Sequence, residues 1–173
     1  MPLPVLEHQS IVPCLSRAFI AVVEDIELGR VFAGVNVADQ AIDWTRNDRC
    51  PGLAVYQNGN PAEVRQTRWL GGPDFAVEVV TPGDRGREKP GFYGKIGTRE
   101  LLFIERPPWS LELSRLGPVG LESAGRSTED GPALLLSDIV PLTFALVSDC
   151  ERLRVSLMHR DGVSSWRISV LTL

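Results

Sequence analysis

The chain has 173 residues, enough for one ordinary domain but too few for two, so we expect a single domain over residues 1–173. Hydrophobic residues make up 43% and charged residues 23%, which excludes a disordered chain. No apolar run is long enough to cross a membrane, and the N-terminus lacks the basic start of a signal peptide. The isolated Cys14, Cys50 and Cys150 argue against a zinc site or disulfide bonds. A soluble cytoplasmic protein with no membrane partner is therefore expected.

The first half of the chain predicts one helix followed by strands. Apolar residues recur at helical spacing between Ser10, a candidate N-cap, and Gly29, a stop signal. Residues 30–37 and 51–57 have strand patterns, and Asn58-Gly59 after the second is a strong turn signal. We expect an antiparallel meander that leads into a further strand after Gly71-Gly72-Pro73.

The middle of the chain predicts a helix between two strands. A short helix is expected to start between Gly86 and Lys89 and to extend to Ile96; Gly91 and Gly94 weaken it by about 1 kcal/mol each, so packing must hold it in place. Residues 100–105 form a continuous apolar run bounded by glutamates, which suits a strand buried on both faces. The pattern indicates an α/β (α+β) fold with a mixed sheet.

The remainder predicts strands and one loop. Residues 109–113 alternate as a strand does, whereas residues 125–132 are polar and contain glycine, which is typical of a loop. Residues 153–157 and 166–170 also alternate, with Asp161-Gly162 between them. These last two segments predict a C-terminal β-hairpin.

Two carboxylates lie on one face of the strand that follows Gly72-Pro73. Asp74 and Glu78 point to the same side because strand side chains alternate. A buried carboxylate costs several kcal/mol unless it is paired or binds a cation, so Glu78 between two valines is a candidate site residue. Asp74 lies about 13 Å away along the strand, too far to share one ion, and we interpret it as a structural cap at the start of the strand with an accessory site role as the alternative.

These motifs together resemble the Uma2 family of restriction endonucleases. The stretch from Gly72 to Arg85, GPDFAVEVVTPGDR, is similar to the family's signature, and Lys89, Tyr93, Gly97 and Glu100 follow at its spacings. The segment Cys50-Pro51-Gly52-Leu53-Ala54-Val55-Tyr56 is similar to the family's preceding Pro-Asp strand. The resemblance covers residues from about 8 to 146 and leaves 150–173 as an appended hairpin.

The resemblance implies a fold, a cofactor and a reaction. The family is assigned to the PD-(D/E)xK nuclease superfamily, whose core is a restriction-endonuclease-like mixed β-sheet flanked by helices. It implies that carboxylates on two adjacent strands hold Mg²⁺ for hydrolysis of DNA phosphodiester bonds. In this chain Glu78 would be the second-strand metal ligand, and Lys89 would replace the usual lysine, where Val80 stands.

One position departs from the family pattern. Where the family has Pro-Asp, this chain has Pro51-Gly52, so the first-strand metal ligand has no side chain. Asp48 or Asp43 would have to reach in from the preceding loop to replace it. Metal affinity follows the number of charged ligands, so Mg²⁺ binding is expected to be weakened.

A basic cluster follows the signature, although the net charge of the chain is −4. Arg85, Arg87 and Lys95 are candidate nucleic-acid contacts, and Lys89 and Arg99 lie in the same run. The alternative is a solvated helix face, which such runs usually are.

Three functions are therefore open. The first is a Mg²⁺-dependent DNA endonuclease, impaired by Gly52, and the second is a catalytically inactive binding or regulatory module with the same fold. The third is a homodimer or partner-binding protein that uses its four tryptophans, which more often pack in a core.

Overall fold

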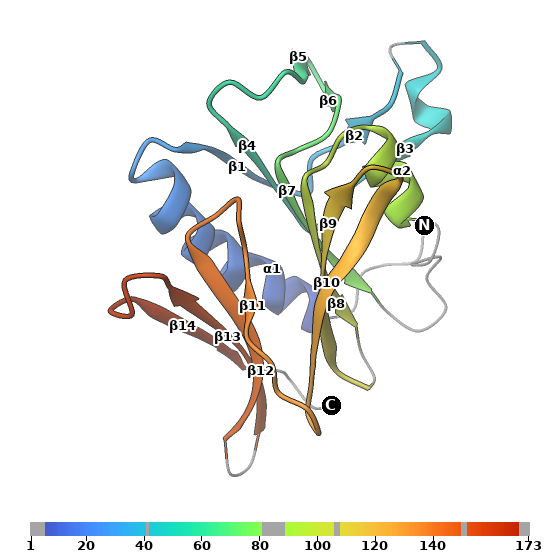
Figure 1. Cartoon of the computed structure of the whole chain (residues 1–173). Helices are drawn as coiled ribbons and strands as arrows, with labels where there is room; N and C mark the ends of the chain where they lie inside the picture. The colour runs from blue at the N-terminus through green and yellow to red at the C-terminus, as the bar shows by residue number, and fades with distance from the viewer. Residues whose placement is uncertain (1–5, 41, 81–88, 106–107, 150–151, 170–173) are drawn as a thin grey trace.

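The computed structural model describes residues 6–40, 42–80, 89–105, 108–149 and 152–169, and its centre is a six-stranded mixed sheet (Figure 1). The strands lie in the order β1-β4-β7-β8-β9-β10, and only β7 and β8 pair in parallel. Their bounds are Gly29–Ala33 (β1), Leu53–Gln57 (β4), Phe75–Val80 (β7), Glu100–Glu105 (β8), Ser110–Gly117 (β9) and Gly120–Thr128 (β10). The helix α2, Lys89–Lys95, lies in the crossover that a parallel pair requires.

The central strand β7 is buried on both faces. One face carries Phe75, Val77 and Val79, which belong to the larger of two apolar clusters. The other face carries Ala76, Glu78 and Val80 and lies under α2. Because side chains alternate along a strand, the sequence itself places Glu78 opposite the main core.

Helix α1, Leu6–Phe19, covers the face of the sheet opposite α2, and a turn of π-helix, η1 (Ile20–Glu24), continues it. Its apolar stripe is fully buried and consists of Ile11, Leu15, Ala18 and Phe19. The prediction of a helix start at Ser10 is wrong by four residues, because the helix begins at Leu6 and Pro13 lies within it. No helix among the described residues is long and apolar enough to cross a membrane.

A second sheet packs on the other side of α1 (Figure 1). It contains β11 (Leu135–Leu136), β12 (Leu142–Asp149), β13 (Arg152–His159) and β14 (Ser165–Ser169), all antiparallel. The predicted hairpin is confirmed as β13–β14, and β12 extends it into a sheet. The prediction of a loop over residues 125–132 is wrong for 125–128, which belong to β10.

A third, small sheet has the order β3-β2-β6-β5. Its strands are β2 (Val37–Ala38), β3 (Asp48–Arg49), β5 (Glu63–Arg65) and β6 (Arg68–Leu70), and a 3-10 turn, η2 (Trp44–Arg46), precedes β3. The Arg49 guanidinium lies 4.8 Å from the centre of the Phe92 ring of α2, so this sheet packs against the helix. The overall architecture confirms the predicted α+β class with a mixed sheet and helices on its faces.

The tryptophans with described side chains serve packing. Trp69 stacks on Tyr56 with 3.8 Å between ring centroids. Trp109 and Trp166 pack against the larger apolar cluster. The side chain of Trp44 lies outside the described part of the chain.

A buried ionic cluster joins the two larger sheets. Glu100, at the start of β8, accepts hydrogen bonds from Arg115 Nε at 2.8 Å, from the Asp138 amide at 3.0 Å and from the Ser137 hydroxyl. The hydrogen bond to Glu100 raises the pKa of the Arg115 guanidinium, so the arginine stays charged. Ser137 also accepts from the amides of Ile139 and Val140, which fixes the turn before β12.

Glu100→Gln is expected to lower the free energy of unfolding by about 2 kcal/mol, because a neutral amide cannot accept all of these charged and buried donors. Urea denaturation followed by fluorescence measures the change. The matched control is Glu112→Gln on the neighbouring strand β9, where the glutamate is half-buried and no hydrogen bond to it is seen among the described residues. Equal urea midpoints for Glu100→Gln and Glu112→Gln would contradict the role of Glu100 as the acceptor that holds this cluster together.

Candidate functional site

Glu78 lies in the middle of β7, between β4 and β8, and its side chain is only 6% exposed. Its Oε1 atom accepts a hydrogen bond from the Tyr93 hydroxyl at 2.7 Å, and its Oε2 atom accepts one from Lys89 Nζ at 3.1 Å. The carboxylate is therefore held by a cation and a phenol, which offset the cost of burying its charge.

Lys89 and Tyr93 reach Glu78 together because residues four apart share one face of a helix. Burial and the charge of Glu78 raise the pKa of Tyr93 well above its usual value, so the hydroxyl remains a donor. Tyr93 is fully buried and Lys89 is 13% exposed at the side chain, so only the lysine end of the cluster meets solvent.

The weak helix α2 is held by close backbone contacts. A Cβ atom at Gly94 would lie 3.2 Å from the Leu121 amide, so glycine lets the helix approach the β9–β10 hairpin. The Gly72 amide donates to the Ile96 carbonyl at 2.8 Å, and a Cβ atom there would lie 2.6 Å from the Thr98 amide. These contacts explain why a glycine-containing heptapeptide positions Lys89 and Tyr93.

Gly52 does not face this cluster. It is buried in the bend that precedes β4, and a Cβ atom built on it would lie 3.2 Å from Val12 Cγ2 of α1 and 3.8 Å from Val79 Cγ2. Those atoms belong to the side of the sheet opposite Glu78. The chain at residue 52 thus lacks a carboxylate and also directs any side chain away from Glu78.

Cys50 is the residue of this segment whose thiol is electrostatically coupled to Glu78, and it is exposed and lines the same apolar pocket as Gly52 and Val12. Partial desolvation raises the pKa of its thiol, and the charges of Glu78 and Asp48 raise it further. The same electrostatic coupling links Cys50 and Arg49 to Tyr93. Cys50 and Tyr93 were not predicted as site residues, although the four-residue spacing of Lys89 and Tyr93 was a usable signal for the second.

The described side chains around Glu78 do not fit a Mg²⁺ ion. Magnesium prefers oxygen ligands with negative charge, whereas the described partners include an ammonium, a phenol hydroxyl and an electrostatically coupled thiol. Within the described ranges, no group of three or more His, Cys, Asp or Glu side chains is placed to hold a metal. Asp48 and Glu78 are the two carboxylates whose charges act on Cys50 from its surroundings.

Asp74 has structural contacts. Its Oδ2 atom accepts from the Gln57 amide at 2.8 Å and from Asn60 Nδ2 at 2.7 Å, and Oδ1 accepts from Arg99 at 3.3 Å. These bonds tie the start of β7 to the turn after β4. Asp74 therefore has a structural role at the start of β7, the end of the strand away from Lys89.

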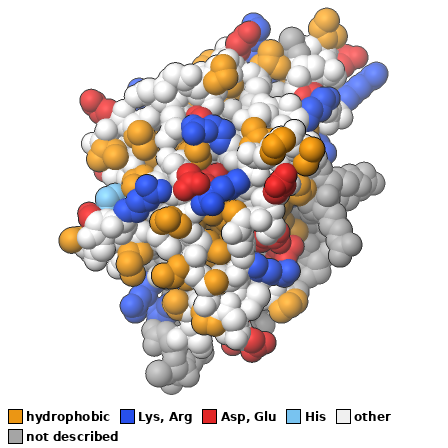
Figure 2. All heavy atoms as spheres, in the orientation of Figure 1, with side chains coloured by type: hydrophobic (Ala, Val, Ile, Leu, Met, Phe, Trp, Pro, Cys, Tyr) orange, Lys and Arg blue, Asp and Glu red, His pale blue; other side chains and the backbone are white. Residues whose placement is uncertain are grey.

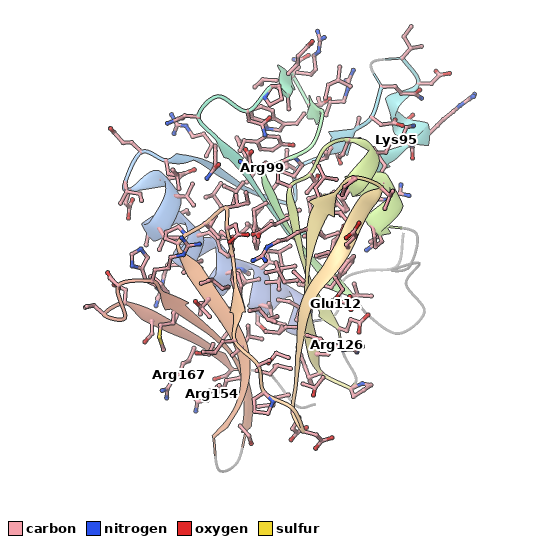
Figure 3. All side chains as sticks on the ribbon, viewed as in Figure 1. Lys95, Arg99, Glu112, Arg126, Arg154 and Arg167 are labelled. Atoms are coloured by element: carbon pink, nitrogen blue, oxygen red, sulfur yellow. The ribbon has the colours of Figure 1, made fainter. Side chains whose placement is uncertain are left out.

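The predicted nucleic-acid contacts are only partly within the described residues. Arg85 and Arg87 lie outside them. Lys95 ends α2 and forms an ion pair with Asp39 at 2.6 Å, whose carboxyl pKa this hydrogen bond lowers (Figure 3). Asp43 pairs with Arg46 at 3.8 Å on the exposed turn η2.

Comparisons with known proteins agree with the fold. A family model for Uma2, described as "Putative restriction endonuclease", matches residues 1–149. A crystal structure titled as a putative nuclease belonging to DUF820 from Anabaena variabilis has a TM-score of 0.60 and 18% identity, covering 74% of this chain and 70% of that one, which shows a shared fold. A comparison with curated proteins found no match. The match over residues 1–149 shows that the chain belongs to the Uma2 family.

Proposed function

We propose that this chain is a DNA-binding member of the Uma2 nuclease family whose centre for metal-dependent hydrolysis is incomplete. One observation carries the proposal: Gly52 supplies no carboxylate and its Cβ direction leads to Val12 and Val79, on the far side of the sheet from Glu78. A hard cation at Glu78 would have to displace Lys89 and would gain no second carboxylate from residue 52.

The residues that remain support binding of phosphate groups. Lys89 is the solvent-facing end of the Glu78 cluster, and Arg49 lies over the Phe92 ring of α2. Two cations on this face of α2 can attract a phosphate by charge, whereas hydrolysis in the family needs carboxylates that hold a metal ion to stabilise the charge developing on the phosphate. Binding and regulation of access to DNA are the roles that this chemistry permits.

A Mg²⁺-dependent endonuclease is the second candidate, and Asp48 favours it. Asp48 lies in β3, two residues before Cys50, and its charge acts on the Cys50 thiol together with that of Glu78. In that case Asp48 and Glu78 would be the ligands, and Lys89 would orient the attacking water as in the family.

One pair of measurements separates the candidates. The wild-type protein is incubated with supercoiled plasmid and Mg²⁺ or Mn²⁺, and its binding to a fluorescent DNA duplex is followed by anisotropy. We expect binding without nicking. Metal-dependent nicking that disappears in Glu78→Gln and persists in the control Glu112→Gln would establish the second candidate instead, and neither binding nor nicking would overturn both.

Self-association remains a further prediction for this fold. Light scattering coupled to size-exclusion chromatography measures it directly. A monomer mass would leave the proposed DNA contacts to a single chain.

A further inference from the structure

A pocket of about 510 Å³ lies between α2 and the turn that joins β9 to β10, and we call it the turn pocket (Figure 1). Gly91 and Gly94 of α2 form part of one wall, and the turn from Gly117 to Gly120 forms the other. Figure 2 shows hydrophobic side chains gathered at the upper right, where this turn and α2 lie, with blue side chains beside them. The volume is within the range of pockets that bind small molecules.

The turn pocket and the Glu78 cluster lie on different sides of α2. Lys89 and Tyr93 are four residues apart and both contact Glu78. Gly91 and Lys95 are also four residues apart, but they are shifted by two positions, which turns them to another side of the helix. Substitutions in the pocket can therefore be made without replacing a residue of the Glu78 cluster.

The wall of the turn pocket is more polar than apolar, although few of its side chains are polar. Among the described residues that line it, only Lys95 has a polar side chain. Backbone amide and carbonyl groups must therefore supply much of the polar surface. An apolar occupant would bury these groups without partners, which costs free energy. The occupant that fits has hydrogen-bonding groups at its edge as well as apolar surface.

The open part of the turn pocket lies beside Gly91. A Cβ atom built on Gly91 would meet no atom of another described element within 4 Å, whereas one on Gly94 would lie 3.2 Å from the Leu121 amide. The helix and the hairpin thus touch at Gly94 and leave space at Gly91. Because glycine has no side chain, a flat ring can approach the backbone closely at this position.

We infer that the turn pocket holds an unpaired base of DNA, and the choice of DNA rests on the proposed function. A nucleobase has hydrogen-bond donors and acceptors at its edge and two flat faces for stacking and apolar contact. The edge matches the backbone groups of the pocket wall, and the faces match the side chains of Pro90, Val119 and Leu121.

Two lysines of α2 support this assignment. Lys95 lines the pocket and is 68% exposed at the side chain, so its charge can attract the phosphate attached to the base. It donates to Asp39, and an ammonium group has three donors. Lys89 lies at the other end of the same helix, which is about 10 Å long, so a DNA strand attracted by Lys89 has its bases within reach of the pocket.

A second copy of the chain fits the turn pocket less well. Val119, in the turn, is 90% exposed and is the apolar side chain that a second copy would offer. A valine has no group that can pair with the backbone amides and carbonyls of the pocket wall, so these groups would lose water without gaining a partner.

The test compares the binding of two fluorescent DNAs to the full chain by anisotropy. One is a perfect duplex, and the other is the same duplex with a one-base bulge of 2-aminopurine. An unpaired base enters a pocket without the cost of unpairing, so we expect the bulged DNA to bind at least about tenfold more tightly. The emission of the 2-aminopurine itself should change on binding, which reports on that base directly.

Gly91→Phe should abolish the preference for bulged DNA, because the ring fills the open part of the pocket. Gly91→Ala is the matched control and should keep the preference, since it changes the same helix position to a better helix former without filling the pocket. Val119→Glu should weaken binding of the bulged DNA by repelling its phosphates. Val163→Glu is its charge-matched control at another exposed valine, between β13 and β14. Thermal melting verifies that each variant is folded.

Equal affinity of the wild type for the two DNAs would overturn the inference, as would an unchanged preference in Gly91→Phe. In either case, binding of the perfect duplex that Lys89→Met weakens would leave the proposed function standing, whereas no binding to either DNA would overturn both. Tighter binding of free deoxyadenosine monophosphate than of bulged DNA would make a mononucleotide the occupant. A dimer that Gly91→Phe and Val119→Glu both dissociate would make a second copy the occupant, and either result would overturn DNA.

Discussion

Lys89→Met is expected to lower the free energy of unfolding by about 3 kcal/mol, because it leaves the Glu78 carboxylate buried without its cation. Methionine keeps the length and apolar surface of the lysine stem, so the loss reports mainly on charge. Both partners are largely excluded from solvent, with side-chain exposures of 13% for Lys89 and 6% for Glu78. Urea denaturation at neutral pH measures the change.

A double-mutant cycle separates the pair from its surroundings. Glu78→Gln/Lys89→Met removes both charges and should recover at least half of the stability lost in Lys89→Met, since no uncompensated charge remains buried. The control Arg46→Met breaks an exposed pair, with Arg46 80% and Asp43 62% exposed at the side chain, and should change stability by less than about 0.5 kcal/mol. If Lys89→Met were as stable as Arg46→Met, the ion pair would not hold Glu78.

The elements around the site could be predicted because local patterns and packing agree there. The run 100–105 is bounded by glutamates and becomes β8 with the same limits, and the helix expected to start between Gly86 and Lys89 becomes α2, which begins at Lys89. Side chains alternate between the two faces of a strand, so the sequence around Glu78 places its side chain opposite Val77 and Val79 whichever strands pair with β7. These features depend on residues close in sequence.

Other strands could not be predicted because tertiary pairing creates them. β10 has mostly polar residues and a register shift between Ser123 and Gly125, so its sequence is typical of a loop, and pairing with β9 makes it a strand. The small sheet contains strands of two or three residues, too short for any periodicity to show.

Only the part of the candidate site that depends on local sequence could be predicted. Glu78 and Lys89 were named from local patterns and the family resemblance, and the structure places them 3.1 Å apart. The direction of Gly52 depends on a bend before β4 that no local pattern reveals. The electrostatic coupling of Cys50 to Glu78 also depends on the path of the chain before β4, so sequence spacing pointed to residue 52, whereas the coupling involves residue 50.

Cys50→Asp is expected to give the chain a Mg²⁺ site, and Gly52→Asp is expected not to. The charges of Glu78 and Asp48 already act on the Cys50 thiol, so an aspartate at residue 50 would add a third carboxylate to this electrostatically coupled group. Because Mg²⁺ affinity follows the number of charged oxygen ligands, Cys50→Asp should bind the ion at least about tenfold more tightly than the wild type. Isothermal titration calorimetry with MgCl₂ measures this.

Gly52→Asp is the matched comparison, since it adds the same carboxylate two residues away at the position where the family has its aspartate. Its Cβ atom would lie 3.2 Å from Val12 Cγ2, next to an apolar pocket that Val12, Pro13 and Ala33 help to line, so the charge would be poorly solvated. We expect it to lower the free energy of unfolding by about 1–3 kcal/mol without any gain in Mg²⁺ binding. A gain in Gly52→Asp and none in Cys50→Asp would mean that the bend before β4 turns residue 52 toward Glu78. The wild type would then differ from a hydrolytic family member by that one carboxylate, whereas the opposite result would show that a carboxylate at residue 52 needs a different backbone path to reach Glu78.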